Sequence, residues 1–154
     1  MAKRRAARLA AEVDLQERMI ALIRAFGLHK PDETPCGRPV SVAEAHALME
    51  LSRGESASPM VQKELASRLR LEKSTVSRLV GMLEDRGWLE RSRSRQDGRA
   101  LELRLTGAGR RTAMGIAEAR RAKFARVLEA IPEEDRESVL KSMRILEEAM
   151  SRSE

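Results

Sequence analysis

The fold is decided by the stretch KSTVSRLVGMLEDRGWLE, residues 73–90, which continues as RSRSRQDGR through residue 99. Its apolar side chains recur every three or four positions, which places them on one face of a helix running to about Arg86. These apolar residues are Val76, Leu79, Val80 and Leu83. The next residue, Gly87, is of the type that commonly ends a helix. The stretch predicts a short helix that buries one side and presents small hydroxyl and basic groups on the other.

A β-hairpin is predicted directly after this helix. Leu101, Leu103 and Leu105 alternate with polar residues, which is the period-two pattern of a half-buried strand. Residues 88–93 form its partner, so residues 94–99 are the tip, which is rich in arginine. A helix end that fits a DNA major groove, joined to a cationic hairpin that reaches a minor groove, is the arrangement of a winged helix-turn-helix.

Two helices are predicted in the N-terminal part of the chain. Residues 9–26 carry apolar side chains at helical spacing up to a glycine, and residues 28–39 then contain prolines that prevent regular structure. Ser41 and Glu44 have the spacing of a capping box, in which the hydroxyl and the carboxylate each accept a hydrogen bond from a free amide. We expect a second helix from this box to about Gly54.

A third helix is predicted ahead of the deciding stretch. Ser58 and Pro59 supply the residue types of an N-cap and a first helical turn. The helix would carry Val61, Leu65 and Leu69, and residues 70–72 would form a tight turn into the next helix.

The C-terminal third of the chain predicts two more helices. Thr106 would start a long helix that runs through Ile131, and Pro132 would interrupt it. Three acidic residues, 133–135, then predict the start of a last helix, because negative charge is stabilised at the positive N-terminal end of a helix dipole. That helix carries an apolar seam at steps of four, three and four: Val139, Met143, Leu146 and Met150.

Such a seam is hard to bury within so small a domain, and the first helix has a similar one at Leu9, Val13 and Ile20. Pairing of two subunits through their terminal helices would bury both, and an intramolecular helix pair is the alternative. The predicted fold is mostly α with a small β-hairpin wing. It comprises a dimerisation helix and Pro-rich linker over 1–40, a winged helix-turn-helix over 41–106, and dimerisation helices over 107–154.

Composition limits which binding partners and which cellular compartment we expect for this protein. The 154 residues have a net charge of +6, which favours a polyanion, although a merely solvated basic surface would give the same number. No segment approaches the roughly 18 apolar residues that span a membrane, and no secretion signal is apparent. The single cysteine cannot form an intramolecular disulfide, so we expect a cytoplasmic protein.

Short motifs in a fixed order carry a resemblance to a known family. They are Glu64-Leu65-Ala66, the run from Ser74 to Val80, Leu83-Glu84, Gly87-Trp88, Asp97-Gly98-Arg99 and Leu105-Thr106 with Gly109. Each motif is weak alone, but together they resemble the MarR family of bacterial transcriptional regulators. The resemblance is close over residues 40–110, and the order of elements extends it to nearly the whole chain.

The resemblance implies a two-fold symmetric homodimer, each subunit offering one winged helix-turn-helix to a DNA half-site. The residues implied to line the major groove are Ser74, Thr75, Ser77 and Arg78, and Lys73 beside them is also expected to bind DNA. Arg99 would enter the minor groove with Asp97 orienting its guanidinium, while phosphates would be neutralised by Arg91, Arg93 and Arg95. N-capping by Ser74 and Thr75 is the alternative role for those hydroxyls. Two departures from the family pattern are Val61, where a capping threonine is frequent, and Arg70, where a turn glycine is frequent.

His29, Cys36 and His46 are the chain's only histidines and its only cysteine, and all three lie between the end of the first predicted helix and the second predicted helix, which contains His46. Two imidazoles and a thiolate suit zinc or copper, with Asp32, Glu44 or Glu50 as a fourth ligand. Oxidation of the thiol is a second reading, and incidental placement is a third.

The sequence as a whole predicts a sequence-specific DNA-binding regulator that is not an enzyme. We expect a homodimeric repressor that binds an inverted-repeat operator in double-stranded DNA and is released by a small-molecule effector. The resemblance places the effector pocket between the first, second and fifth helices, and no cofactor is expected to be required. The alternatives are a metal- or thiol-responsive regulator, a non-specific nucleoid-associated protein and a protein-binding module.

Overall fold

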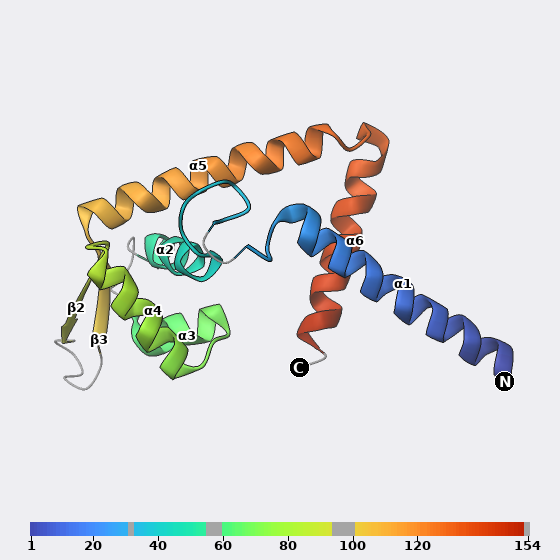
Figure 1. The fold of residues 1–154 in the computed structure, drawn as a ribbon, viewed down its shortest axis with the longest axis horizontal. Coiled ribbons are helices and arrows are strands. Elements are labelled where there is room, and N and C mark those ends of the chain that lie inside the picture. Colours follow the sequence, from blue (N-terminus) through green and yellow to red (C-terminus); the bar gives the residue numbers. More distant parts are fainter. Residues whose placement is uncertain (31–32, 55–59, 94–100, 153–154) are drawn as a thin grey trace. The chain divides into compact units, whose positions relative to one another are not determined.

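The computed structural model of the chain describes residues 1–30, 33–54, 60–93 and 101–152 (Figure 1). Its elements, in order, are α1 (Ala2–Phe26), α2 (Val42–Gly54), β1 (Met60–Val61), α3 (Gln62–Leu69), α4 (Lys73–Asp85), β2 (Leu89–Arg93), β3 (Leu101–Leu105), α5 (Gly107–Glu129) and α6 (Glu133–Ser151). The chain divides into two compact units, Met1–Ala119 and Arg120–Glu154. The predicted fold class, mostly helical with a small antiparallel β component, is confirmed.

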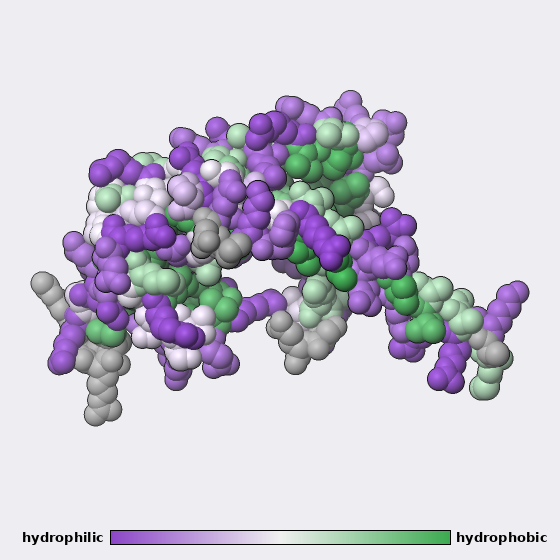
Figure 2. Space-filling model, in the orientation of Figure 1, coloured by the Kyte–Doolittle hydropathy of each residue, from purple (hydrophilic) through white to green (hydrophobic). Residues whose placement is uncertain are grey.

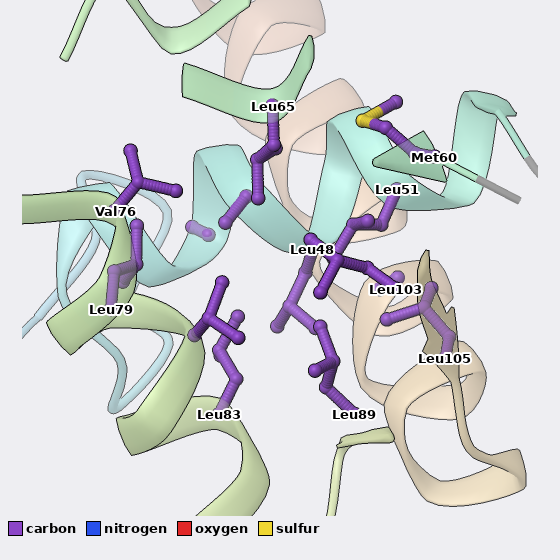
Figure 3. Packing of buried hydrophobic residues seen from close by; sticks show 14 of the residues in the cluster. Leu48, Leu51, Met60, Leu65, Val76, Leu79, Leu83, Leu89, Leu103 and Leu105 are labelled. Atoms are coloured by element: carbon purple, nitrogen blue, oxygen red, sulfur yellow. The ribbon is translucent and has the colours of Figure 1, made fainter. Parts of the chain in front are cut away.

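The core of the first unit is built almost entirely from aliphatic side chains. Figure 3 shows them converging from α2, α3, α4 and the strands, with Leu48 and Leu51 between Leu65, Leu83 and Leu103. Leu48, Leu65 and Leu83 are completely buried. Burying each such side chain contributes about 1.5–3 kcal/mol. The apolar face predicted for α4 is therefore the face that holds this helix to the domain.

The three strands form one antiparallel sheet in the order β1-β3-β2. The predicted hairpin is confirmed, with Leu89 opposite Leu105 and Arg93 opposite Leu101. The predicted start of the third helix was wrong, because Met60 and Val61 are not helical but pair with β3. Met60 is buried by this pairing, α3 begins only at Gln62, and its N-cap is Val61 rather than Ser58. Ser58 and Pro59 lie outside the described residues.

The beginning of α2 confirms the predicted capping box. The Ser41 backbone N–H donates to Glu44 Oε2 at 2.8 Å, and the Glu44 N–H donates to Ser41 Oγ at 3.2 Å. Both orphan amides at this helix end are therefore satisfied by side chains. The reciprocal pair also fixes the direction in which the chain enters α2.

The first helix ends where the sequence indicated. Gly27 adopts the left-handed conformation, with φ of 88°, and its N–H bonds to the carbonyls of Ile23 and Arg24. The helix starts at Ala2, earlier than the predicted residue 9. Figure 2 shows hydrophobic surface along α1 interrupted by hydrophilic residues. The exposed apolar side chains on it include Leu9, Val13 and Ile20.

The junction between α4 and α5 is held by a compact set of hydrogen bonds. Gly87, with φ of 68°, turns the chain out of α4, and Thr106 Oγ1 donates to its carbonyl at 2.7 Å. The same oxygen accepts the Gly109 N–H at 3.0 Å, and the Thr106 N–H donates to the Trp88 carbonyl at 3.1 Å. A Cβ on Gly109 would overlap that carbonyl, so a side chain here cannot be accommodated without movement.

The second unit comprises the end of α5 and α6. The long helix was predicted to include Ile131, but α5 ends at Glu129 and Ile131 lies in the connection. Arg136 Nε closes this connection by donating to the carbonyls of Leu128 and Ile131, each at 3.1 Å. Acidic residues occupy the first turn of α6, as predicted. No helix in the described ranges is long and apolar enough to cross a membrane.

Candidate nucleic-acid interface

Two helices at the surface of the first unit, α3 and α4, are joined by a tight turn. Arg70 adopts the left-handed conformation, with φ of 52°, and the Leu71 N–H bonds back to the Ala66 carbonyl at 3.1 Å. A glycine would adopt this conformation more readily. The turn therefore forms despite the arginine that was noted as a departure at this position.

The outer face of α4 carries the side chains that the sequence assigned to DNA. Val76, Leu79, Val80 and Leu83 are buried, which fixes the rotation of the helix about its axis. As a consequence, the remaining side chains of its first two turns face outward. Lys73, Ser74, Ser77 and Arg78 are exposed, and Thr75 is half-buried.

The start of α4 has amides available for an external acceptor. Its N-cap is Glu72, which makes no side-chain hydrogen bond to the helix end. Ser74 and Thr75 make no capping bond among the described residues either, so the capping alternative for their hydroxyls finds no support there. Free N–H groups and the positive end of the helix dipole together favour a phosphate.

The exposed cations on α3 and α4 differ in their surroundings. Arg68 on α3 lies 2.6 Å from Glu64 and 3.5 Å from Glu50, and the hydrogen bond to Glu64 raises the pKa of Arg68. Arg78 on α4 has no carboxylate partner within the described part of the chain. The guanidinium of Arg78 is therefore available to a nucleic acid, whereas that of Arg68 already has two acidic neighbours.

Two arginines of the predicted wing, Arg91 and Arg93, lie on β2 but have different surroundings. Arg93 is exposed near the end of β2, as a phosphate contact requires. Arg91 instead forms an ion pair with Glu84, which ties β2 to α4. A contact between Arg91 and a phosphate would have to compete with this carboxylate. Arg95, Asp97 and Arg99 lie outside the described residues, so their proposed contacts stay predictions.

A buried carboxylate connects α2 to the end of α4, and sequence reasoning missed it. Glu44 is 3% exposed and accepts from Arg86 Nε at 2.9 Å through the oxygen that the capping box leaves free. Arg86 is the C-cap of α4, and its guanidinium carbon lies 4.9 Å from the centre of the Trp88 ring. The only local signal was the capping box itself, since Arg86 is distant in sequence.

Comparison with known proteins agrees with this geometry. The family model described as the MarR family matches residues 39–100. Over that segment, the chain is similar to the MarR family. None of the curated proteins matches the chain.

Solved MarR-family structures share the fold. Streptococcus pneumoniae FabT in complex with DNA aligns with a TM-score of 0.69 at 20% identity, covering 96% of this chain and 98% of FabT. The Staphylococcus aureus MepR–DNA complex gives 0.65 at 20% identity, covering 72% of this chain and 80% of MepR. Streptomyces coelicolor PcaV, solved with its natural ligand, gives 0.61 at 21% identity over 91% of each chain.

The candidate metal ligands are not gathered in the part of the chain that the structure describes. Within the described ranges, no group of three or more His, Cys, Asp or Glu side chains is placed to hold a metal ion. His29 and His46 are exposed, and Cys36 Sγ lies 3.0 Å from Thr34 Oγ1. Two of the proposed fourth ligands are engaged elsewhere, Glu44 with Arg86 and Glu50 with Arg53. Asp32 lies outside the described residues.

The predicted dimerisation residues are displayed at the surface. Leu9, Val13 and Ile20 on α1 are exposed. On α6, Val139, Met143 and Met150 are exposed, and Leu146 is half-buried. Exposed apolar side chains in such numbers are typical of an interaction surface. Their role in dimerisation stays a prediction.

Proposed function

We propose that the chain is a homodimeric, sequence-specific DNA-binding repressor that recognises an inverted-repeat operator and is released by a small-molecule effector. The observation that carries the proposal is the outer face of α4. Its first two turns present hydroxyl and cationic side chains, and a fully buried apolar face holds the helix in place. Base readout in the major groove requires such a rigidly mounted helix with short polar side chains.

The relatives support the choice of DNA as the partner. FabT and MepR, which share the fold, were each solved in complex with DNA. The net charge of +6 favours a polyanion. Arg78 would grip a base edge or a phosphate from α4, while Arg93 and the predicted tip residues Arg95 and Arg99 would contact the backbone and the minor groove.

The dimer and its regulation follow from geometry. Two recognition helices on one face of B-DNA must lie about 34 Å apart to reach successive major grooves. Pairing through α1 and α6 would hold them at this spacing. An effector that binds preferentially to a dimer with a different spacing would release the operator, because a ligand shifts an equilibrium only through its differential affinity.

The test is selection of the purified protein against a random pool of DNA duplexes at near-physiological salt. We expect an inverted repeat to be enriched. Arg78→Ala should weaken binding to that repeat by about 1–3 kcal/mol and relax the preference at one position of each half-site. Arg68→Ala is the matched control, since Arg68 is also an exposed helical arginine but is paired with Glu64.

Arg99→Ala tests the wing in the same assay. If Arg99 reads the minor groove, the loss should again be about 1–3 kcal/mol. An unchanged dissociation constant for the selected site would remove that role. No enrichment of any sequence by the unmodified protein would contradict the proposal as a whole.

A nucleoid-associated protein is the second candidate, and one observation favours it. Lys3, Arg4 and Arg5 are exposed at the start of α1 and could bind phosphates without regard to sequence. The two functions differ in the ratio of specific to non-specific affinity. Tight binding with no preferred sequence, falling steeply with salt, would support this candidate over the repressor.

A further inference from the structure

Gly81 lies inside α4, with helical residues on both sides of it. A glycine within a helix is unfavourable, because its backbone loses more conformational freedom on folding than that of alanine. The described part of the chain gives no structural reason for this glycine. It does not adopt a positive φ, and a Cβ built on it would meet no described atom within 4 Å. Alanine would therefore fit here and would strengthen the helix.

Gly81 stands at the centre of the outer face of α4. It follows Ser74 by seven residues and Arg78 by three, spacings that bring all three to one side of an α-helix. The opposite side carries the buried Val76 and Leu83, which hold α4 against the core. The glycine therefore faces the same way as the side chains that we propose to read the major groove.

The charges on either side of Gly81 indicate which kind of partner approaches it. Arg78, one turn earlier, is exposed and has no carboxylate partner within the described part of the chain. Asp85, one turn later on the same face, is an exposed carboxylate, which repels phosphates. A polyanion is therefore attracted to the outer face of α4 as far as Gly81 and repelled beyond it.

The dimensions of a helix and of a DNA groove make a missing side chain important. An α-helix with its side chains is about 10–12 Å across, and the major groove of B-DNA is about 12 Å wide. A helix that enters the groove therefore nearly fills it. At a glycine the helix surface is recessed toward the Cα atoms, which lie about 2.3 Å from the axis. One edge of the groove can approach the backbone of α4 more closely at Gly81 than any other residue would permit.

We propose that Gly81 is a specificity-determining residue of the DNA interface. Its missing side chain lets the DNA contact the backbone of α4, so that Ser74 and Arg78 on the same face reach the base edges. The inference rests on the proposed function, because it concerns how that interface fits an operator. It deepens the function by giving a reason for a residue that weakens the helix and that the fold does not require.

The depth of α4 in the groove matters for specific binding and hardly at all for non-specific binding. Base edges lie at the floor of the groove, and a hydrogen bond to them weakens steeply with distance. A side chain at residue 81 would hold the helix away from the floor and lengthen the bonds from Ser74 and Arg78. Phosphates stand at the rim and attract cations over a longer range, so contacts to them persist. A substitution at Gly81 should therefore lower the ratio of specific to non-specific affinity.

Gly81→Ala separates this role from a structural one, because its effects on folding and on DNA binding have opposite signs. The melting temperature should rise by about 2–4 °C, the shift expected in a chain of this size from the higher helix propensity of alanine. Affinity for the sequence that the unmodified protein selects should fall by about tenfold or more, as expected for a side chain forced into a close contact. Affinity for a scrambled duplex of the same length should stay within about twofold.

Two further variants of the full chain assign the effect to the recess. Gly81→Leu keeps a high helix propensity but adds a larger side chain, so it should lose more specific affinity than Gly81→Ala. Met82→Ala is the control, because Met82 is exposed beside Gly81 and the helix turns it about 100° away. This substitution removes bulk without filling the recess and should leave both affinities unchanged. Fluorescence anisotropy of labelled duplexes measures the affinities, and circular dichroism measures the melting temperature.

Three results would overturn the inference and leave the proposed function standing, because in each of them the unmodified protein still selects a sequence. Gly81→Ala could bind that sequence as tightly as the unmodified protein does. It could lose affinity for the scrambled duplex to the same extent, or Met82→Ala could lose as much specific affinity as Gly81→Ala. If the unmodified protein selects no sequence at all, the proposed function fails, and this role of Gly81 fails with it.

Discussion

The winged-helix region buries most of its apolar side chains, whereas the last helix, α6, leaves its own exposed. Every fully buried hydrophobic residue of the described structure lies between Val40 and Ile116, whereas α6 buries none of its own. Yet α6 has as regular an apolar seam as α4. The difference shows that the winged-helix region buries its apolar side chains within its own unit, while the seam of α6 is exposed, as is typical of an interaction surface.

The two regions also differ in how their helices begin. The first turn of α2 is closed by the reciprocal bonds of Ser41 and Glu44. The N-cap of α6 is Pro132, which makes no side-chain bond, and that helix end relies on acidic residues such as Glu134. Directional hydrogen bonds thus fix the geometry of the winged-helix region, while screened charge supports the helix at the C-terminus.

The largest expected effect comes from the core. Leu48→Ala removes a completely buried side chain that faces α3, α4 and the strands, and should lower the free energy of unfolding by about 2–5 kcal/mol. Leu140→Ala, at a half-exposed position of α6, should change it by less than about 0.5 kcal/mol. Urea denaturation of both variants measures the contrast, and equal losses would show that α6 is buried in the folded subunit.

Dimer association should be sensitive to substitutions in α6, although the free energy of unfolding should not be. Leu146→Glu places a charge in the seam of α6 and should weaken dimer association by at least about 1.5–3 kcal/mol per protomer, the value of burying one leucine. Arg144→Glu makes an acidic substitution on the same helix off the seam and is the control. Light scattering over a dilution series reports the mass. A variant at Leu146 that remains a dimer as stable as the parent would place the interface elsewhere.

Periodicity predicted most of this fold because most of its helices bury one face. Val76, Leu79 and Leu83 decide the position of α4, and their spacing alone revealed it. The same logic failed at Met60 and Val61, where a strand of two residues is too short to show any period. The start of α3 was misplaced for this reason. Ser58 and Pro59 indicated a helix start, but the residues that follow them pair with β3, a contact that forms only in the folded chain.

The site was predictable where its residues are close in sequence. The exposed face of α4 and the strands of the wing follow from local pattern. The ion pair of Glu84 with Arg91, the link from Glu44 to Arg86 and the cavity lined by Arg38, Trp88 and Arg111 do not follow from local pattern. Each joins residues from different elements, so its existence depends on tertiary packing that periodicity cannot specify.

A smaller effect is expected at the junction that positions α4 against α5. Gly109→Ala would force a Cβ against the Trp88 carbonyl, and we expect a loss of about 1–3 kcal/mol in the free energy of unfolding. Gly81→Ala is the control, because its Cβ would meet no neighbour and alanine favours the helix. Thermal unfolding of the two variants should shift in opposite directions. A stable Gly109→Ala protein would mean that the close approach of α5 to Trp88 is dispensable.

The smallest expected losses of stability compare the start of α2, which is capped by side-chain hydrogen bonds, with the start of α6, which is not. Ser41→Ala should cost about 1 kcal/mol through loss of the cap, while Ser41→Gly should cost only a few tenths. Glu134→Gln in α6 should cost about 0.3–1 kcal/mol at low salt, where its charge interacts with the helix dipole. Raising the salt concentration should remove the effect at Glu134 and leave that at Ser41, since screening acts on exposed charges and not on a neutral hydroxyl. If both effects vanish together, the capping box acts mainly through the charge of Glu44, and the contrast between directional and electrostatic caps would not hold.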